Sequence, residues 1–152
     1  MKNYLQQYKF GFDAWGLALF LIVMLPNFLW FAVPASNDIL RTESVTPMID
    51  AIGMEFQGFM VAALCCVVRK DVQPLRMSLL VWLVVVCVAI YFASWILYYF
   101  GMVHPFVIML LTIPPCLAFF LYAIDRKNLP AILCTCGFTI CHALFGIINF
   151  IA

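Results

Sequence analysis

Residues 77–100 read MSLLVWLVVVCVAIYFASWILYYF and carry no charged side chain. A helix needs roughly 20 consecutive apolar residues to cross the hydrocarbon core of a bilayer, so this stretch is long enough to span one. The rest of the chain has the same character, because 67% of its 152 residues are hydrophobic and only 10% are charged. Such a composition is far from that of soluble domains and predicts an integral membrane protein.

Four further apolar stretches complete the pattern. The five expected transmembrane helices lie at about residues 12–33, 51–68, 77–100, 105–124 and 130–151. The second is the weakest of them, because Glu55 and Gln57 lie near its start. The predicted fold is therefore all-α, a polytopic bundle of five transmembrane helices that forms a single domain over residues 1–152.

The basic residues predict the orientation of this bundle. With five spans, all of them except Arg41 fall on one side of the membrane: Lys2, Lys9, Arg69, Lys70, Arg76, Arg126 and Lys127. Basic loops face the cytoplasm in most membrane proteins, so we expect a cytoplasmic N-terminus and an external C-terminus. Without the second helix, Lys2 and Lys9 would lie on the other side of the membrane from most of the basic residues. This favours including the second helix among the transmembrane spans. The expected location is a cell membrane, of the bacterial inner-membrane type.

Polar and small residues recur along one face of three of the expected helices. In residues 130–151 they are separated by steps of four and three, which places them on one stripe: Thr135, Thr139, His142, Gly146 and Asn149. Residues 77–100 and 12–33 carry similar stripes. We expect these faces to contact other helices and their hydroxyl groups to hydrogen-bond across the contact.

The polar residues of the external half form the candidate ligand site. Seven residues are predicted to line it: Asn27, Glu55, Gln57, Trp95, Tyr98, His142 and Asn149. A carboxylate at membrane depth costs roughly 2.5–3.5 kcal/mol on insertion scales, so Glu55 should be paired, protonated or in contact with water, with Arg41 as one candidate partner. Aromatic faces and one carboxylate attract cations, so the site suits a small amphipathic or cationic molecule. The same space could equally be filled by the protein's own side chains.

Two functions fit these patterns. In the first, the protein binds or transports a small molecule through this pocket. In the alternative, it is a non-catalytic accessory, regulatory or immunity-type subunit that packs against a partner membrane protein or against copies of itself. Contact with membrane lipid is expected in both cases.

Other function classes lack support. The sequence has no HExxH, GxSxG or phosphate-loop motif, so no catalytic residues and no cofactor are expected. The seven cysteines lack the paired spacing of metal ligands, so we expect free thiols and no metal. A net charge of +1 argues against nucleic acid as a partner.

Overall fold

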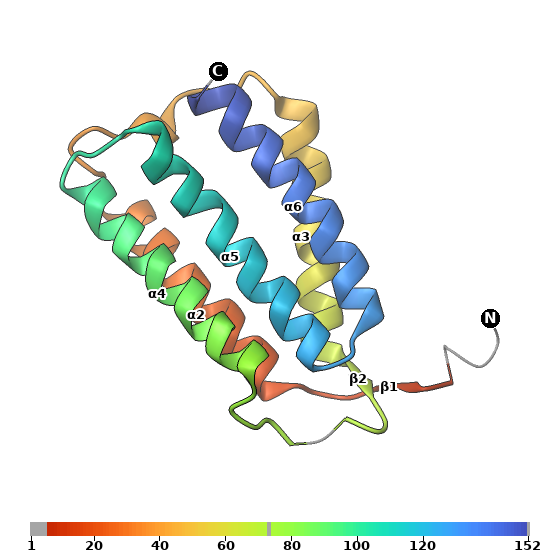
Figure 1. Cartoon of the computed structure of the whole chain (residues 1–152). Helices are drawn as coiled ribbons and strands as arrows, with labels where there is room; N and C mark the ends of the chain where they lie inside the picture. Colours follow the sequence, from red (N-terminus) through yellow and green to blue (C-terminus); the bar gives the residue numbers. More distant parts are fainter. Residues whose placement is uncertain (1–5, 73, 152) are drawn as a thin grey trace.

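The computed structural model describes residues 6–72 and 74–151 (Figure 1). Within these residues the chain forms five long helices: α2 (Ala14–Ala32), α3 (Pro47–Cys66), α4 (Leu79–Tyr99), α5 (Pro105–Asp125) and α6 (Leu129–Phe150). Each is long and apolar enough to cross a membrane. The predicted all-α architecture with five such helices is confirmed, and most helix ends lie within two residues of the expected ones.

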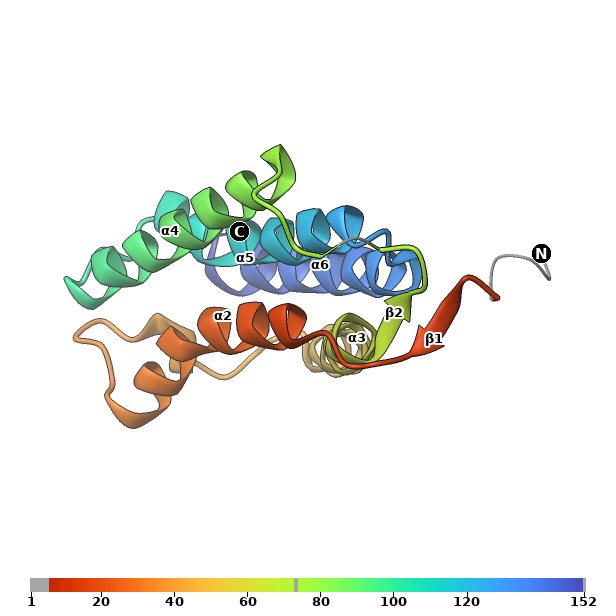
Figure 2. The ribbon, with the colours of Figure 1, turned by 90° about the horizontal axis from the view of Figure 1, so that it is seen from below.

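Consecutive helices run in opposite directions and form two layers (Figures 1 and 2). One layer contains α4, α5 and α6 side by side in that order, and the other contains α2 and α3. Helix α3 packs closely along α6, whereas α2 makes fewer contacts with the rest of the bundle. Helices α2 and α3 meet near Gly16, where an added Cβ would lie 2.7 Å from the Leu64 carbonyl oxygen. They separate toward their other ends (Figure 1).

The end of the bundle where α2 begins, called here the Asp13 end, is held by a buried carboxylate. Asp13 caps α2 by accepting hydrogen bonds from the backbone nitrogens of Trp15 and Gly16. It also accepts from the Tyr122 hydroxyl at 2.9 Å and from Arg126 Nε at 3.3 Å. Asp13 therefore joins the start of α2 to the end of α5.

All described basic residues except Arg41 lie at or beside the Asp13 end, on β1, β2 and the segments that connect the helices: Lys9, Arg69, Lys70, Arg76, Arg126 and Lys127. Lys2, the one remaining member of the predicted group, lies outside the described residues. The alternation of the five helices thus separates Arg41 from the other basic side chains, which is the distribution expected from the sequence.

A short strand pair at the Asp13 end was not expected. Strand β1 (Tyr8–Phe10) pairs antiparallel with β2 (Val67–Arg69), with Tyr8 opposite Arg69. The prediction that the second helix continues to residue 68 is therefore wrong, because α3 ends at Cys66 and Val67 leaves the helix to pair with β1. At its other end α3 begins at Pro47, four residues before the expected start, which places Asp50 in its first turn.

The predicted polar stripes do face the interior, and Asn27 of α2 donates a hydrogen bond across to the Tyr91 hydroxyl of α4, as expected. The hydroxyl groups of Ser94 and Thr135 bond differently. Ser94 and Thr135 are buried, and Gly146 packs against Thr112 of α5. The Ser94 hydroxyl donates to the Ile90 carbonyl of its own helix, and Thr135 does the same within α6, each at 2.7 Å. The expectation of hydrogen bonds across helices is wrong for these residues, since a helical serine or threonine can satisfy itself on the carbonyl four residues earlier.

Candidate functional site

The loop that follows α2 closes the opposite end of the bundle, called here the Asp38 end. Asp38 accepts hydrogen bonds from Trp30 Nε1 at 2.8 Å, from the Tyr98 hydroxyl at 2.9 Å and from Arg41 Nε at 2.7 Å. Arg41 also lies over the Trp30 ring and donates to the Trp30 carbonyl. Burial raises the pKa of Asp38, but the hydrogen bonds from Trp30, Tyr98, Arg41 and Ala35 outweigh it and hold the pKa below its usual value. The role of Asp38 in this cap was not predicted, and Arg41 was expected as a partner for the Glu55 carboxylate.

Two of the predicted site residues hold this loop. Tyr98 is fully buried and, besides donating to Asp38, accepts from the Leu40 backbone nitrogen at 3.2 Å. Asn149 accepts from the Val45 backbone nitrogen at 2.8 Å and donates to the Thr46 hydroxyl at 2.7 Å. Their polar groups are therefore engaged by the protein itself.

Beneath the cap lies a central cavity of 350 Å³ between the diverging helices α2 and α3, with α5 and α6 as its floor. Leu40 of the loop and Trp30 of the cap line its end. Four of the seven predicted site residues line this cavity: Asn27, Gln57, Trp95 and His142. The structure thus brings these four together from four different helices.

The polar groups around the central cavity differ in whether the protein satisfies them. Asn27 Nδ2 donates to the Tyr91 hydroxyl at 2.8 Å and so ties α2 to α4. Gln57 and His142, in contrast, make no side-chain hydrogen bond to any residue in the described ranges. Trp95 Nε1 is buried and likewise has no acceptor among them. A fully buried polar atom without a partner, such as Trp95 Nε1, is uncommon in folded proteins, whereas Gln57 and His142 are half-buried and open to the cavity.

The imidazole of His142 is fixed by aromatic stacking. Its ring lies 5.1 Å from that of Phe138 and 6.3 Å from that of Phe145, with interplanar angles of 17° and 12°. All three residues project from α6 and line the cavity. The stacking orients the ring while leaving both of its nitrogens available to a ligand.

Glu55 lies outside the cavity. Its side chain is exposed on the outer face of α3 and forms no ion pair or hydrogen bond with the part of the chain that the structure describes. Residues two apart on a helix diverge by about 200°, so Glu55 points away from the cavity because Gln57 points into it. Arg41, its expected partner, pairs with Asp38 instead.

A side cavity of 220 Å³ adjoins the central one between α3 and α6. The two cavities share Gln57, Phe138, His142 and Phe145 as lining residues. The side cavity is also lined by Asp50, a residue the sequence analysis had assigned to the external loop. A helix-start signal, Thr46 followed by Pro47 and then Asp50, was present and could have placed it on α3.

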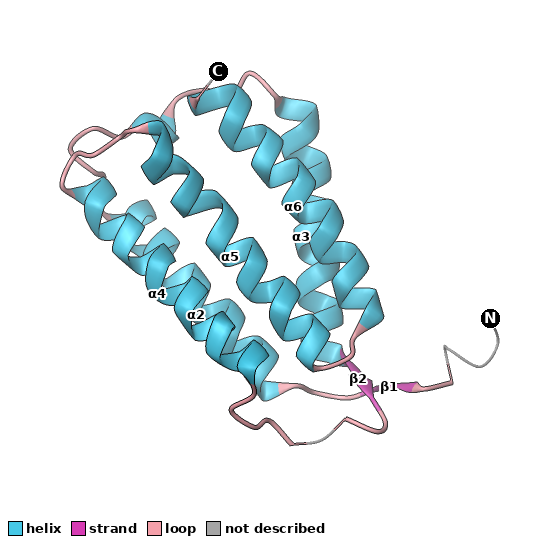
Figure 3. Ribbon diagram, viewed as in Figure 1, coloured by secondary structure: helices cyan, strands magenta, loops and turns pink. Residues whose placement is uncertain are grey.

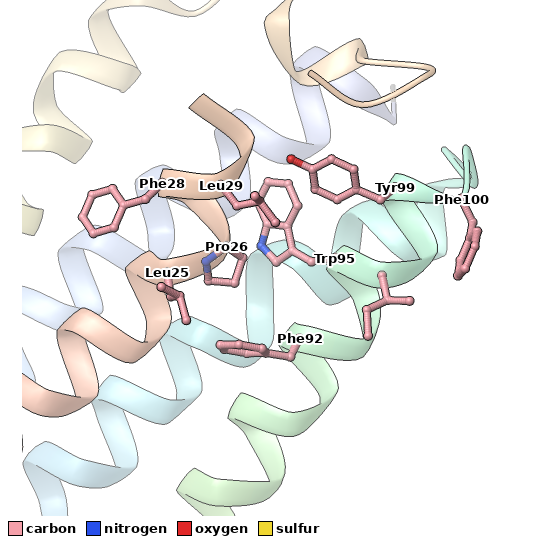
Figure 4. A pocket seen from close by; sticks show the side chains of 9 residues that line it. Leu25, Pro26, Phe28, Leu29, Phe92, Trp95, Tyr99 and Phe100 are labelled. Carbon is pink, nitrogen blue, oxygen red and sulfur yellow. The ribbon is translucent and has the colours of Figure 1, made fainter. Parts of the chain in front are cut away.

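The largest hollow is an outer groove of 720 Å³ between α2 and α4 (Figure 4). Leu25, Phe28 and Leu29 of α2 face Phe92 and Trp95 of α4 across it. Its lining is almost entirely apolar, and its one hydroxyl, on Tyr99, donates to the Val33 carbonyl at 2.8 Å. Specific recognition requires a few placed polar groups, so the central cavity is the better candidate site despite its smaller volume.

The described residues contain no cluster of three or more His, Cys, Asp or Glu side chains arranged to hold a metal ion. No known protein-family model, curated protein or solved structure matches this chain.

Proposed function

We propose that this chain is a multi-pass membrane protein that binds, and in doing so can transport, a small amphipathic molecule in the central cavity. The observation that carries the proposal is the pair Gln57 and His142, two polar side chains on the cavity wall without a partner in the described residues. Both side chains are half-buried, so their polar atoms are open to a molecule in the cavity. A ligand that hydrogen-bonds to them gains about 0.5–1.5 kcal/mol for each bond.

The dimensions and chemistry of the cavity support a ligand with a mainly apolar body. Its volume of 350 Å³ lies within the range of about 300–1,000 Å³ typical of small-molecule sites. The walls are mostly aromatic and aliphatic, and the polar groups gather at Gln57 and His142. A neutral imidazole donates from one nitrogen and accepts at the other, and an amide does both, so this pair can bind an alcohol, a carbonyl or an amine.

Helix α2 provides the simplest route into the cavity. It makes fewer contacts than the other long helices, and Pro26 within it removes one backbone hydrogen bond. In this proposal the middle of α2 bows outward, while its contact with α3 near Gly16 and the cap on Asp38, which includes Trp30, both stay in place. The cytoplasmic N-terminus and external C-terminus expected from the basic residues put the cavity in the external half.

Native mass spectrometry of the protein, gently extracted from its own membrane, tests this function. We expect a small bound mass that is lost in His142→Leu and in Gln57→Leu but kept in Glu55→Gln, a matched control on the outer face of α3. A bound mass that persists in both cavity variants, or none in the unaltered protein, would contradict the proposal.

A second function is favoured by Glu55 itself. In a membrane its exposed carboxylate, next to the exposed Ile52 and Phe59, would be costly unless another chain covers this face. This supports the role of an accessory subunit that packs against a partner membrane protein through α3. The same spectra separate the two functions, because a co-purifying membrane protein lost on Glu55→Gln, with no small mass bound, would favour the subunit.

A further inference from the structure

Asp50 is the one charged side chain that lines the central cavity, the side cavity or the outer groove, as far as the described residues extend. Its Oδ1 accepts a hydrogen bond from the Thr46 hydroxyl at 3.0 Å, and Thr46 in turn accepts from Asn149 at 2.7 Å. These bonds fix the carboxylate on α3. Its second oxygen, Oδ2, receives no hydrogen bond from the residues that the structure describes.

Asp50 and Gln57 lie on the same face of α3, two turns or about 10 Å apart. Gly53 occupies this face between them, at steps of three and four residues, and has no side chain to separate the two. An added Cβ at Gly53 would lie 3.2 Å from the Cys141 side chain, so α3 and α6 approach each other closely at this point. The side cavity is lined on both sides of this contact, and so extends along α3 from Gln57 to Asp50.

The two cavities together can hold one elongated molecule. They meet at Gln57 and His142, so a ligand whose apolar body lies in the central cavity can extend a polar end between these side chains. The side cavity alone, at 220 Å³, is smaller than typical small-molecule sites of about 300–1,000 Å³. It is better suited to the head group of a ligand than to a separate molecule.

The charge at the end of this path determines which head group fits. Among the described residues no lysine or arginine lines either cavity, and Arg41, at this end of the bundle, is paired with Asp38. An anionic head group would meet the Asp50 carboxylate without a counter-charge. A protonated amine would instead form an ion pair with Oδ2, while its body lies against aromatic rings.

We propose that the ligand of this site is an amphipathic amine, with its ammonium group bound by Asp50 in the side cavity and its apolar body in the central cavity. The inference rests on the proposed small-molecule function and names its ligand class. It assigns Asp50 the role of the site's carboxylate, which the sequence analysis had given to Glu55.

Cys141 is a native residue whose modification rate can report on the occupied site. It lines the side cavity, whereas Cys136, on the same helix, is exposed and lines none of the three hollows. The purified protein is treated with N-ethylmaleimide in the presence of 4-phenylbutylamine or of the neutral 4-phenylbutan-1-ol. The modification rate of each cysteine is then read by fragment mass spectrometry.

We expect the amine to protect Cys141 at a concentration at least tenfold lower than the alcohol, with Cys136 unaffected. Asp50→Asn keeps an acceptor for Thr46 and should remove this preference while leaving protection by the alcohol unchanged, which also shows that the variant is folded. Glu55→Gln, with the same charge change on the opposite face of α3, should retain the preference.

Equal protection by amine and alcohol, or a preference that survives Asp50→Asn, would overturn the inference and leave the central cavity as a site for neutral molecules. Protection by neither compound would also overturn it. In that case the native mass spectra still decide separately whether the cavity binds another small molecule.

Discussion

The hydrogen-bond network of Asp13 permits a quantitative prediction about stability. Asp13 is 9% exposed, and its Oδ1 accepts from the backbone nitrogens of Trp15 and Gly16 at 3.1 and 3.2 Å. Tyr122 donates to both carboxylate oxygens, and Arg126 donates to Oδ2. Replacement by alanine removes a helix cap, worth about 0.5–2 kcal/mol, and the hydrogen bonds of a charged group to Tyr122 and Arg126, each worth about 1.5–3 kcal/mol.

We therefore expect Asp13→Ala to lower the free energy of unfolding by about 4 kcal/mol, somewhat less than the sum because the two effects share one side chain. Asp13→Asn keeps an oxygen for the two backbone nitrogens and should cost roughly 1–2 kcal/mol less than alanine, the value of the retained cap. Tyr122→Phe removes a hydrogen bond to a charged group and should cost about 1.5–3 kcal/mol.

Reversible unfolding by sodium dodecyl sulfate in mixed micelles, followed by circular dichroism, measures these differences. The double variant Asp13→Ala with Tyr122→Phe should lose less than the sum of the two single changes, because phenylalanine removes the hydroxyl that alanine leaves without its acceptor. The reasoning is refuted if asparagine destabilises as much as alanine, or if the two single effects add fully.

Two further predictions concern helix packing and the cap. An added Cβ at Gly137 would lie 2.5 Å from the Phe56 ring, whereas Gly58 has open space around it. Gly137→Ala should therefore lower the free energy of unfolding by about 1–3 kcal/mol in the same assay, and Gly58→Ala should not lower it. Equal effects of the two substitutions would contradict the packing argument. The pKa of Asp38 is lower in the folded protein than its value of about 3.9 in the unfolded chain. The ionised carboxylate therefore contributes its full stabilisation above that pH, and the stabilisation is lost as the pH falls through the pKa of the folded state. The Nε1 resonance of Trp30 should thus keep its position from pH 7 to pH 5 and shift only below about pH 4, and a shift between pH 7 and pH 5 would show that another group controls the cap.

The sequence predicted the helices well because the signals for them are local. Apolar length and the alternation of basic loops depend on consecutive residues, and both remain readable without knowledge of the fold. The pairing of β1 with β2 depends instead on two segments almost 60 positions apart, Tyr8 with Arg69. Val67 and Val68 are apolar and directly follow α3, so nothing local marks the end of that helix.

Helical periodicity predicts which residues of each helix face the candidate site, but only where it is applied to every helix. It placed Asn27 and His142 on the interior stripes of their helices, and both line the central cavity; Trp95, which was grouped with them by depth, lines it as well. Applied to Glu55 and Gln57, the same rule separates the two by about 200°, so both could not have faced one pocket. Asp50 was missed because the start of α3 was placed after it, which removed it from the helix whose face it shares with Gln57.

Depth along the bundle is insufficient to identify a ligand site, as Tyr98 and Asn149 illustrate. Both lie near the Asp38 end, as expected, yet each is satisfied by the loop: Tyr98 by Asp38, and Asn149 by Thr46. Gln57 and His142 lie deeper on α3 and α6 and have no such partner within the described ranges. A loop long enough to fold back over a bundle first satisfies the polar groups nearest to it. We therefore expect the polar groups beyond its reach to be the ones that bind the proposed ligand, rather than all polar groups at that depth.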